Sequence, residues 1–471
     1  MRLLLVSANQ EKQYPYPVLP IGTGMVRNSL EDEGHKVDFC DICFCEDWRE
    51  TIREYINNNK YDLLLLSLRN IDNCLFPQTK EYITFYKELV KECKAITNLP
   101  IVAGGIAMRM MKKLLLDELD IDYGYINQTS ADFVKGLEQI VKKGNVYLYA
   151  GFIGKSKSNM NKTVNPRLPD YEIYEKLDIK QYTDKGGVVG FHTKYGCDLS
   201  CIYCSYPVIE GREVLCYDPK KLVNIIEKVV KRNHLQFFEF ADSTFNHPLS
   251  HAKEICKLLA EKQLNVGWSA FISPKFIDEE FINLCKKSGC TGIDLGIDSA
   301  SNTMLKNLGK GFSSDDIAAS CRMIQKYNIP VCFNLLIGGP GENEKTLNET
   351  FAFLNDYPNC AVSAYSALRV YPDTPLEEIA RQEGQVEGSL LYPQFYISKE
   401  IVDNLNEILE EHRKTHPEWM LRGIVIPPSA LVIERFNKNR SSPLWTEKNT
   451  GYLVRRKNNP VSKSEKCSES R

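Results

Sequence analysis

The sequence predicts an α/β protein with a doubly wound Rossmann-like domain, a partial (β/α)6 barrel and a mainly helical C-terminal extension. Three observations predict this fold. Short apolar segments alternate with amphipathic segments over the first 150 residues, as strands and helices do around a parallel sheet. A second series of six strand–helix pairs begins near Gly187. A polar stretch rich in Lys, Ser, Asn and Pro separates the two series and predicts a linker.

These changes in pattern predict four parts of the chain. They are the Rossmann-like domain at 1–150, the linker at 151–186, the barrel at 187–380 and a mainly helical C-terminal region at 381–471. The charged stretch at 438–471 predicts disorder at its end.

Composition excludes several classes of protein. The 471 residues are 43% hydrophobic and 25% charged, which is ordinary for a globular chain. The net charge of −2 predicts no nucleic-acid or membrane surface. No apolar run reaches the ~18 residues that a membrane span needs. Sixteen cysteines without the framework of a small disulfide-rich domain predict a reducing compartment, and we expect the protein in the cytoplasm.

In the first domain each predicted strand is followed by a helix. The predicted strands are Arg2–Val6, Lys36–Cys40, Tyr61–Leu66 and Pro100–Ala103, and the predicted helices are Gly22–Glu33, Trp48–Asn59, Phe85–Thr97 and Ser130–Lys143. Tyr61–Leu66 is continuously apolar, which is typical of a parallel strand buried on both faces. Ligands of such domains bind beyond the carboxyl ends of the strands.

The second series follows the same rule. Its predicted strands are Val188–Phe191, Gln236–Ala241, Val266–Ala270, Gly292–Ile297, Val331–Ile337 and Ser363–Arg369. Its predicted helices are Pro219–Arg232, Ser250–Glu261, Asp278–Lys287, Ser313–Tyr327 and Glu344–Leu354, with a further helix at Lys399–Lys414. Active sites of β/α barrels gather at the carboxyl ends of the strands.

Three cysteines lie directly after the first barrel strand. Cys197, Cys201 and Cys204 have C-x3-C-x2-C spacing. Three thiolates can hold three irons of a [4Fe–4S] cluster, one fewer than the usual four, which leaves the fourth iron free for another ligand. A zinc site would need a fourth protein ligand, and neither nearby candidate, Cys216 or His192, has the spacing of a zinc finger.

The stretch from Tyr195 to Cys204 resembles the signature of the radical S-adenosylmethionine (SAM) superfamily, including the aromatic residue Tyr203 before the last cysteine. The resemblance implies a [4Fe–4S] cluster whose free iron chelates the amino and carboxylate groups of SAM. An electron from the cluster then splits a C–S bond of SAM and gives a 5′-deoxyadenosyl radical. The resemblance also implies an electron donor such as flavodoxin or ferredoxin.

Turns after later strands resemble the SAM contacts of this family. Asp242 is the candidate for the SAM amino group, and Asp298 or Ser299 is the candidate for its ribose and carboxylate. The turn from Leu336 to Glu342 resembles the adenine contact; its candidate residues are Gly338, Gly339 and Glu342.

The first domain resembles the cobalamin-binding domain that precedes many radical SAM enzymes. The implied contacts are Ser67, Arg69, Asn70, Asp72, Asn73, Gly104 and Gly105. Two features depart from the family pattern: the Asp-x-His-x-x-Gly motif is absent, and Asn127–Asp132 replaces the usual acidic turn. We therefore expect base-off, His-off cobalamin, with Arg69 at the lower face of the metal.

The two resemblances together imply a cobalamin-dependent radical SAM methyltransferase. It would act on an unactivated carbon of a small molecule or peptide, through the 5′-deoxyadenosyl radical and methylcobalamin. Cobalamin would then lie over the barrel mouth, so the two domains should dock with their strand ends facing each other.

Three alternatives remain open at this point. The first is a rearrangement, cyclisation or ring contraction with the same cofactors. The second is a methylthiotransferase with another cluster on N-terminal cysteines, where Cys43 and Cys45 would share one face of an extended segment and Cys40 would face the other way. The third is a non-catalytic iron–sulfur protein that senses or binds.

Overall fold

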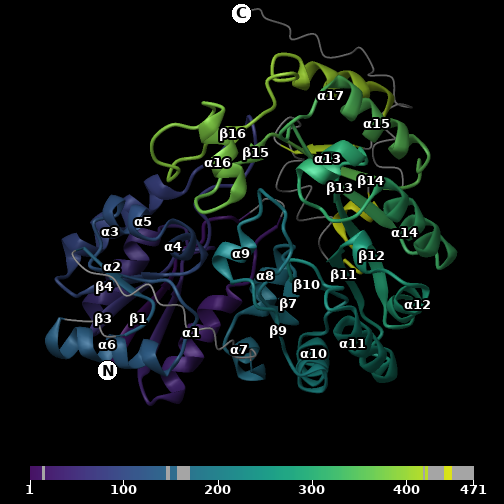
Figure 1. The fold of residues 1–471 in the computed structure, drawn as a ribbon. Coiled ribbons are helices and arrows are strands. Elements are labelled where there is room, and N and C mark those ends of the chain that lie inside the picture. The colour runs from purple at the N-terminus through teal and green to yellow at the C-terminus, as the bar shows by residue number, and fades with distance from the viewer. Residues whose placement is uncertain (13–15, 145–148, 156–169, 417–418, 423–439, 448–471) are drawn as a thin grey trace, which may run out of the picture.

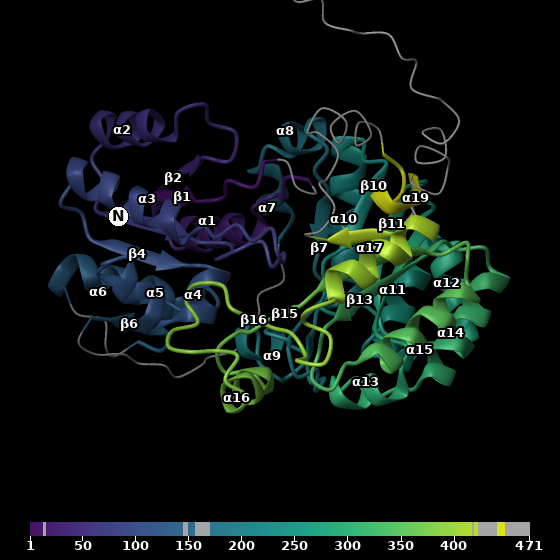
Figure 2. The same cartoon turned by 90° about the horizontal axis from the view of Figure 1, so that it is seen from above.

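The protein forms two mainly parallel sheets, each covered by helices, that lie side by side in both views (Figures 1 and 2). The computed structural model describes residues 1–12, 16–144, 149–155, 170–416, 419–422 and 440–447. The N-terminal half contains a six-stranded sheet, and the C-terminal half contains a seven-stranded sheet. None of the helices in these ranges is long and apolar enough to cross a membrane.

The N-terminal sheet has the order β2-β1-β3-β4-β5-β6. Its strands are β1 (Arg2–Ser7), β2 (Lys36–Asp41), β3 (Leu63–Ser67), β4 (Ile101–Gly104), β5 (Tyr123–Tyr125) and β6 (Phe152–Gly154), of which only β6 is antiparallel to its neighbour. Its helices are α1 (Ile21–Asp32), α2 (Trp48–Asn58), α3 (Ile83–Ile96), α4 (Ile106–Met111), α5 (Lys113–Glu118) and α6 (Ala131–Lys143). Leu64 packs in one core cluster and Leu65 in the other, which explains why β3 is apolar from Leu63 to Leu66.

The C-terminal sheet is an open barrel with the order β17-β14-β13-β12-β11-β10-β7, and all its pairs are parallel. Its strands are β7 (Val189–Phe191), β10 (Phe237–Phe240), β11 (Gly267–Ile272), β12 (Cys290–Asp298), β13 (Val331–Ile337), β14 (Ala361–Ser366) and β17 (Met420–Arg422). Its principal helices are α10 (Pro219–Asn233), α11 (Leu249–Lys262), α12 (Glu279–Lys287), α14 (Ser314–Lys326), α15 (Glu344–Asn355) and α17 (Leu405–Thr415). Phe333 and Leu335 of β13 pack in the core cluster shared with these helices.

Shorter elements complete the chain. They are α7 (Tyr171–Glu175), α8 (Ile179–Asp184), β8 (Lys194–Tyr195), α9 (Tyr206–Ile209), β9 (Leu215–Cys216), the 3-10 helix η1 (Pro274–Phe276), α13 (Asn302–Asn307), β15 (Leu368–Arg369), α16 (Pro375–Gln382), β16 (Phe395–Tyr396) and α19 (Leu444–Glu447). α16, β15 and β16 lie beside the junction of the two halves (Figures 1 and 2).

The two halves meet through the carboxyl ends of their strands, as expected. Ser366, at the end of β14, donates a hydrogen bond to the carbonyl oxygen of Phe76 in the loop after β3 (3.0 Å). Lys112, after α4, pairs with Asp373 in the segment that follows β15 (2.5 Å). At the open edge of the barrel, Val18 forms a parallel bridge with Val188. A ligand that extends from one set of strand ends would therefore reach the other.

The structure corrects several sequence-based expectations. The expected irregular linker contains α7 and α8, and Ile173 and Tyr182 of these helices are buried in the barrel core. The helix expected from Lys399 begins at Leu405. The barrel sheet gains a seventh strand, β17, and the first sheet gains β5 and β6. The expected disordered end of the chain, from residue 448, and the apolar run Gly423–Pro428 lie outside the described residues.

The expectation for the N-terminal cysteines was also wrong. Residues 43 and 44 form a turn instead of an extended segment. Cys40 and Cys45 therefore pack in the same core cluster, whereas Cys43 packs in the barrel cluster. This arrangement separates Cys43 from the other two and does not favour a second cluster on these three thiols.

Candidate functional site

The cysteine loop lies at the carboxyl end of the first barrel strand. β8 precedes the loop and pairs with β9, which follows it, so the loop is closed at its base. Gly196 has a φ of +86°, and a side chain there would collide with the carbonyl oxygen of Glu213. The amide of Cys197 donates to the carbonyl oxygen of Gly211 (3.0 Å). The loop is therefore held in one shape before any metal binds.

The three predicted cysteines have thiols close enough to influence one another. Burial raises the pKa of Cys204 to about 12, and the thiols of Cys201 and Cys197 contribute to the increase. Burial likewise raises the pKa of Cys201. The raised pKa values of Cys201 and Cys204 keep these two thiols protonated unless a cationic metal group compensates their charge.

The donor set fits a cluster better than a single ion. Across the described ranges, no three His, Cys, Asp or Glu side chains converge on a position where one metal ion could bind. A structural zinc ion needs four ligands around one point, whereas an iron–sulfur cube takes one thiolate per iron and so tolerates wider spacing. The residues present therefore fit a [4Fe–4S] cluster with one open iron.

A buried ion pair lies against the cysteine loop. Lys310 donates to Asp298 (2.6 Å), and each side chain is only 8% exposed. Tyr203, between two of the cysteines, also donates to Asp298 and accepts from Lys310 (3.3 Å). Burial alone would lower the pKa of Lys310, but the carboxylate of Asp298 and the nearby cysteines raise it above its usual value. The site thus holds a fixed positive charge beside the thiols.

Asp242 supports the strand that leads into the loop. Its carboxylate accepts hydrogen bonds from the amide and hydroxyl of Thr193 (2.8 Å each) and from the amide of Lys194 (3.3 Å). Both carboxylate oxygens are therefore occupied within the protein. The candidate contact for the SAM amino group is placed beneath the loop, where it fixes the path from β7 to β8.

The other candidate SAM residues lie at the ends of β12 and β13. Glu342 is buried and accepts from the amide of Gly338 (2.8 Å). Gly338 has a φ of +101°, and Gly339 packs against Leu308. Ser299 instead points toward α15, where its hydroxyl bonds to that of Thr350 (2.8 Å). The structure thus brings the glycine turn close to α13, whereas the Ser299 hydroxyl is occupied by Thr350 and by the amide of Ser301, which caps α13.

The candidate cobalamin residues gather at the carboxyl ends of β3 and β4. Glu11 organises the first group, because it accepts hydrogen bonds from Arg69, Asn70 and Tyr82. Ser67 accepts from Thr23 (2.9 Å). Arg69 is thus paired with a carboxylate and is not an isolated cation.

Two candidates in the same loop have structural partners. Asp72 is fully buried and accepts from Arg369 of the other half (2.8 Å). Asn73 accepts from the amides of Leu75 and Lys80 and so closes the loop after β3. Gly105 has a φ of +96°, and a side chain there would collide with the carbonyl oxygen of Leu68; Gly104 accepts from the amide of Leu68 (2.9 Å).

Polar atoms at the junction lack partners within the described part of the chain. Arg109 of α4 donates to the Tyr195 hydroxyl and to the carbonyl oxygen of Asn127 (3.0 Å), but its Nε is buried without a hydrogen bond there. The Oε1 atom of Gln128 is also buried without a hydrogen-bond partner among the described residues. Buried polar atoms of this kind normally bind a partner. A cofactor rich in amide groups, such as cobalamin, fits this place between the two sets of strand ends.

Several of these residues could not be recognised from the sequence. Glu11, Arg109 and Lys310 stand in no motif, and only the fold brings them to the strand ends. The one local feature of the sequence that could have indicated Lys310 is the glycine on either side of it. Gly309 and Gly311 both adopt a φ of +71°, so they give this loop a fixed shape. Arg369 ends β15 and pairs with Phe395 of β16, whereas the sequence had placed it at the end of the last predicted barrel strand.

Comparisons with known proteins agree with this geometry. Residues 12–134 match the B12 binding domain, and residues 192–354 match the Radical SAM superfamily. Tryptophan 2-C-methyltransferase of Streptomyces laurentii is 22% identical over 76% of this chain and 71% of its own length. A tRNA-2-methylthio-N(6)-dimethylallyladenosine synthase of Clostridium tetani is 22% identical over 66% of this chain and 67% of its own.

A solved structure resembles the whole described fold. It is the radical SAM methyltransferase TsrM of Kitasatospora setae, with cobalamin and a [4Fe–4S] cluster bound. Its TM-score is 0.84, its sequence identity is 19%, and the match covers 97% of this chain and 98% of that one. At this identity the likeness shows a shared fold.

Proposed function

We propose that this chain, which joins a B12 binding domain to a radical SAM domain, is a cobalamin-dependent radical SAM methyltransferase that acts on a carbon atom of a small molecule. One observation carries the proposal. The three-cysteine loop and the ligand ends of the B12 binding domain face the same barrel mouth, where Arg109 of one half contacts Tyr195 of the other. A small-molecule substrate agrees with tryptophan, which is bound in a structure of the similar protein TsrM.

The cofactors divide the chemistry between them. When bound, the cluster supplies an electron to SAM, and cobalamin carries a methyl group from SAM to the substrate. Cys197, Cys201 and Cys204 would hold the cluster. Ser67, Arg69, Asn70 and the backbone at Gly104 and Gly105 would contact cobalamin in its base-off, His-off form.

The remaining residues position SAM and the loop. Glu342 and the Gly338–Gly339 backbone would contact adenine, while Asp242 holds the strand before the cysteine loop through Thr193 and Lys194. The burial of Cys197 and of the Lys310–Asp298 pair keeps water away from this side of the loop.

The proposal includes the partners and the division of the chain. We place the cobalamin domain at 1–150, the linker at 151–186, the radical SAM barrel at 187–380 and the capping region at 381–471. We further propose a cytoplasmic location, a flavodoxin or ferredoxin as electron donor, and no nucleic-acid partner.

Anaerobic reconstitution with iron, sulfide and hydroxocobalamin tests the proposal. After desalting, we expect one cobalt and about four irons per chain, with no axial-nitrogen signature in the EPR spectrum of Co(II). SAM labelled in its methyl group should then transfer label to a small molecule from a substrate panel. If the methyl label stays on cobalamin and the substrate is rearranged without gaining label, methyl transfer to the substrate is contradicted. About eight irons would instead favour a methylthiotransferase.

A further inference from the structure

The inner face of the open barrel is exposed near the carboxyl end of β11. Phe271 is 49% exposed, whereas its neighbours Ala270 and Ile272 are 3% and 1% exposed and pack in the core cluster under the barrel helices. Successive side chains of a strand point to opposite faces, so Phe271 points to the inner face. It lies in register with Asp294 of β12. A large apolar ring on this face therefore lacks the cover that the rest of β11 has.

The inner face is also open on the next strand, β12. Gly296 lies between Leu295 and Ile297, which are buried in the helix-covered core, so its own position faces inward. Apart from its two chain neighbours, a Cβ atom added to Gly296 would meet no atom of the described residues within 4 Å. A glycine inside a strand often marks a place where a ligand approaches the backbone closely. The preceding inward position of β12 is Asp294.

Polar side chains close this space toward the beginnings of the strands. Asp294 accepts hydrogen bonds from Asn334 (3.3 Å) and from the indole nitrogen of Trp445 (3.2 Å). Glu239 of β10 accepts from the Tyr16 hydroxyl with both carboxylate oxygens (3.0 and 2.8 Å). Each carboxylate thus has donors within the protein. The floor that these residues form needs no charged ligand to complete it.

We propose that the space bordered by Phe271, Gly296 and this floor is the substrate chamber, and that it takes a neutral aromatic ring of the substrate. This inference rests on the proposed methyl transfer. The cysteine loop and the turn at Gly338 follow strands of the same barrel, so a ring in the chamber lies beside the proposed cofactor sites. A ring can stack on the exposed face of Phe271. A charged group would lose its water there without gaining a free partner on the floor.

Equilibrium dialysis with ring probes tests the chamber without using turnover. The probes are indole, which is neutral, and its charged relatives indole-3-carboxylate and tryptamine. The protein is the reconstituted enzyme with cobalamin, without reductant, in the absence and presence of saturating SAM. We expect indole to bind about 10-fold more tightly than either charged probe, because burial of an unpaired charge is costly. SAM should not displace indole, since the two sites are separate.

Two substitutions alter the chamber in opposite ways. Gly296→Leu fills the open space and should weaken indole binding by about 10-fold or more. Phe271→Ala removes one wall and should weaken it by about 3- to 10-fold. Both variants should keep the iron content, the cobalt content and the Kd for SAM of the unmodified enzyme. Val141→Ala is the control, because it removes an apolar side chain that is 38% exposed on α6 of the other half, and it should leave the Kd for indole unchanged.

Contrary results would overturn the inference. They are equal affinity for the three probes, no indole binding tighter than about 10 mM, or an unchanged Kd for indole in both chamber variants. Displacement of indole by SAM would assign the chamber to SAM and overturn the inference as well. If circular dichroism shows that Gly296→Leu does not fold, Phe271→Ala decides alone. Indole binding with the expected pattern, in a protein that retains neither cobalt nor SAM, would support the chamber and contradict the proposed function.

Discussion

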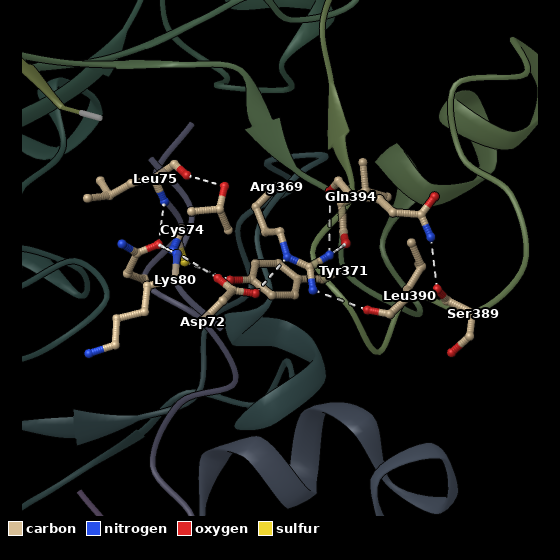
Figure 3. A network of polar contacts seen from close by, with 12 residues as sticks. Asp72, Cys74, Leu75, Lys80, Arg369, Tyr371, Ser389, Leu390 and Gln394 are labelled. Atoms are coloured by element: carbon tan, nitrogen blue, oxygen red, sulfur yellow. Dashed lines mark hydrogen bonds and ion pairs between the residues drawn. The ribbon is translucent and has the colours of Figure 1, made fainter. Parts of the chain in front are cut away.

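Asp72 and Arg369 form a buried ion pair that joins the two halves of the protein. The Nε atom of Arg369 donates to the Asp72 carboxylate at 2.8 Å, and the side chains are 0% and 3% exposed for Asp72 and Arg369, respectively. Figure 3 shows the guanidinium extending further, to the carbonyl oxygen of Leu390 (3.1 Å). Beside the pair, Cys74 and Tyr371 make a second contact between the halves (2.8 Å). The pair therefore fixes the loop after β3, which carries candidate cobalamin contacts, to the rim of the barrel.

Asp72→Asn should destabilise the protein strongly. The variant leaves the Arg369 charge buried without its carboxylate, a change that typically costs about 3–5 kcal/mol. Asp373→Asn is the matched control, because the Lys112–Asp373 pair also crosses the junction but is exposed and should contribute at most about 1 kcal/mol. Urea unfolding, followed by fluorescence and circular dichroism, measures both. Similar losses in the two variants would contradict the special role of the buried pair.

Replacement of any one cluster cysteine with alanine should abolish iron binding. Cys197→Ala, Cys201→Ala or Cys204→Ala leaves two thiolates, too few to retain a cube that already lacks a fourth protein ligand. Iron should fall from about four per chain to near zero after reconstitution and desalting. Cys216→Ala is the control, since Cys216 is exposed on β9 and should retain full iron. Loss of iron from this control would mean that Cys216 is a ligand after all.

Much of the fold could be predicted because its strands and helices bury continuous or periodic apolar faces. β13 was predicted at its observed limits, Val331–Ile337, since its alternate residues pack under the helices. β17 could not be predicted, because three residues carry no periodic pattern and its pairing with β14 depends on the tertiary fold. The faces of Cys43 and Cys45 were assigned wrongly because a turn interrupts the extended chain.

The candidate site was predictable where a motif occupies one loop. The three cysteines are such a case. The roles of Lys310 and Arg109 depend on contacts between segments that are distant in the sequence. Lys310 contacts Asp298 and Tyr203, and Arg109 contacts Tyr195. Conversely, Asp72 matched a ligand motif, but the structure assigns its carboxylate to Arg369. Sequence alone cannot distinguish a polar residue that binds a ligand from one that binds another segment.

Arg109→Met should weaken cobalamin retention without removing the cluster. The change deletes the guanidinium that bridges Tyr195 and Asn127 and whose Nε is available to a bound cofactor. We expect cobalt per chain after desalting to fall several-fold, while iron stays unchanged. Lys113→Met is the control, because this lysine is exposed on the neighbouring helix α5 and pairs with Asp117. Equal cobalt in all three proteins would remove Arg109 from the cofactor site.

Glu342 should make the stability of the protein fall as pH rises from about 4.5 to about 7. Burial raises the pKa of its carboxyl group to about 7, although hydrogen bonds from the Gly338 and Gly339 amides oppose the increase. Between the ordinary value of 4.5 and this raised value, the unfolded chain releases the proton while the folded chain keeps it. Unfolding therefore becomes more favourable with rising pH, and the full difference is on the order of 3 kcal/mol.

Glu342→Gln tests this linkage, because a glutamine keeps the acceptor for Gly338 but cannot ionise. Without SAM, the free energy of unfolding of the unmodified protein, measured relative to Glu342→Gln, should decrease steadily from pH 4.5 to pH 7 and then level off. Taking the difference cancels the other groups that titrate in this range. Glu344→Gln, at an exposed neighbouring position at the start of α15, is the control for the substitution itself. A constant difference across the range would show that Glu342 is already ionised in the folded protein, so that its carboxylate accepts from the Gly338 amide as an anion.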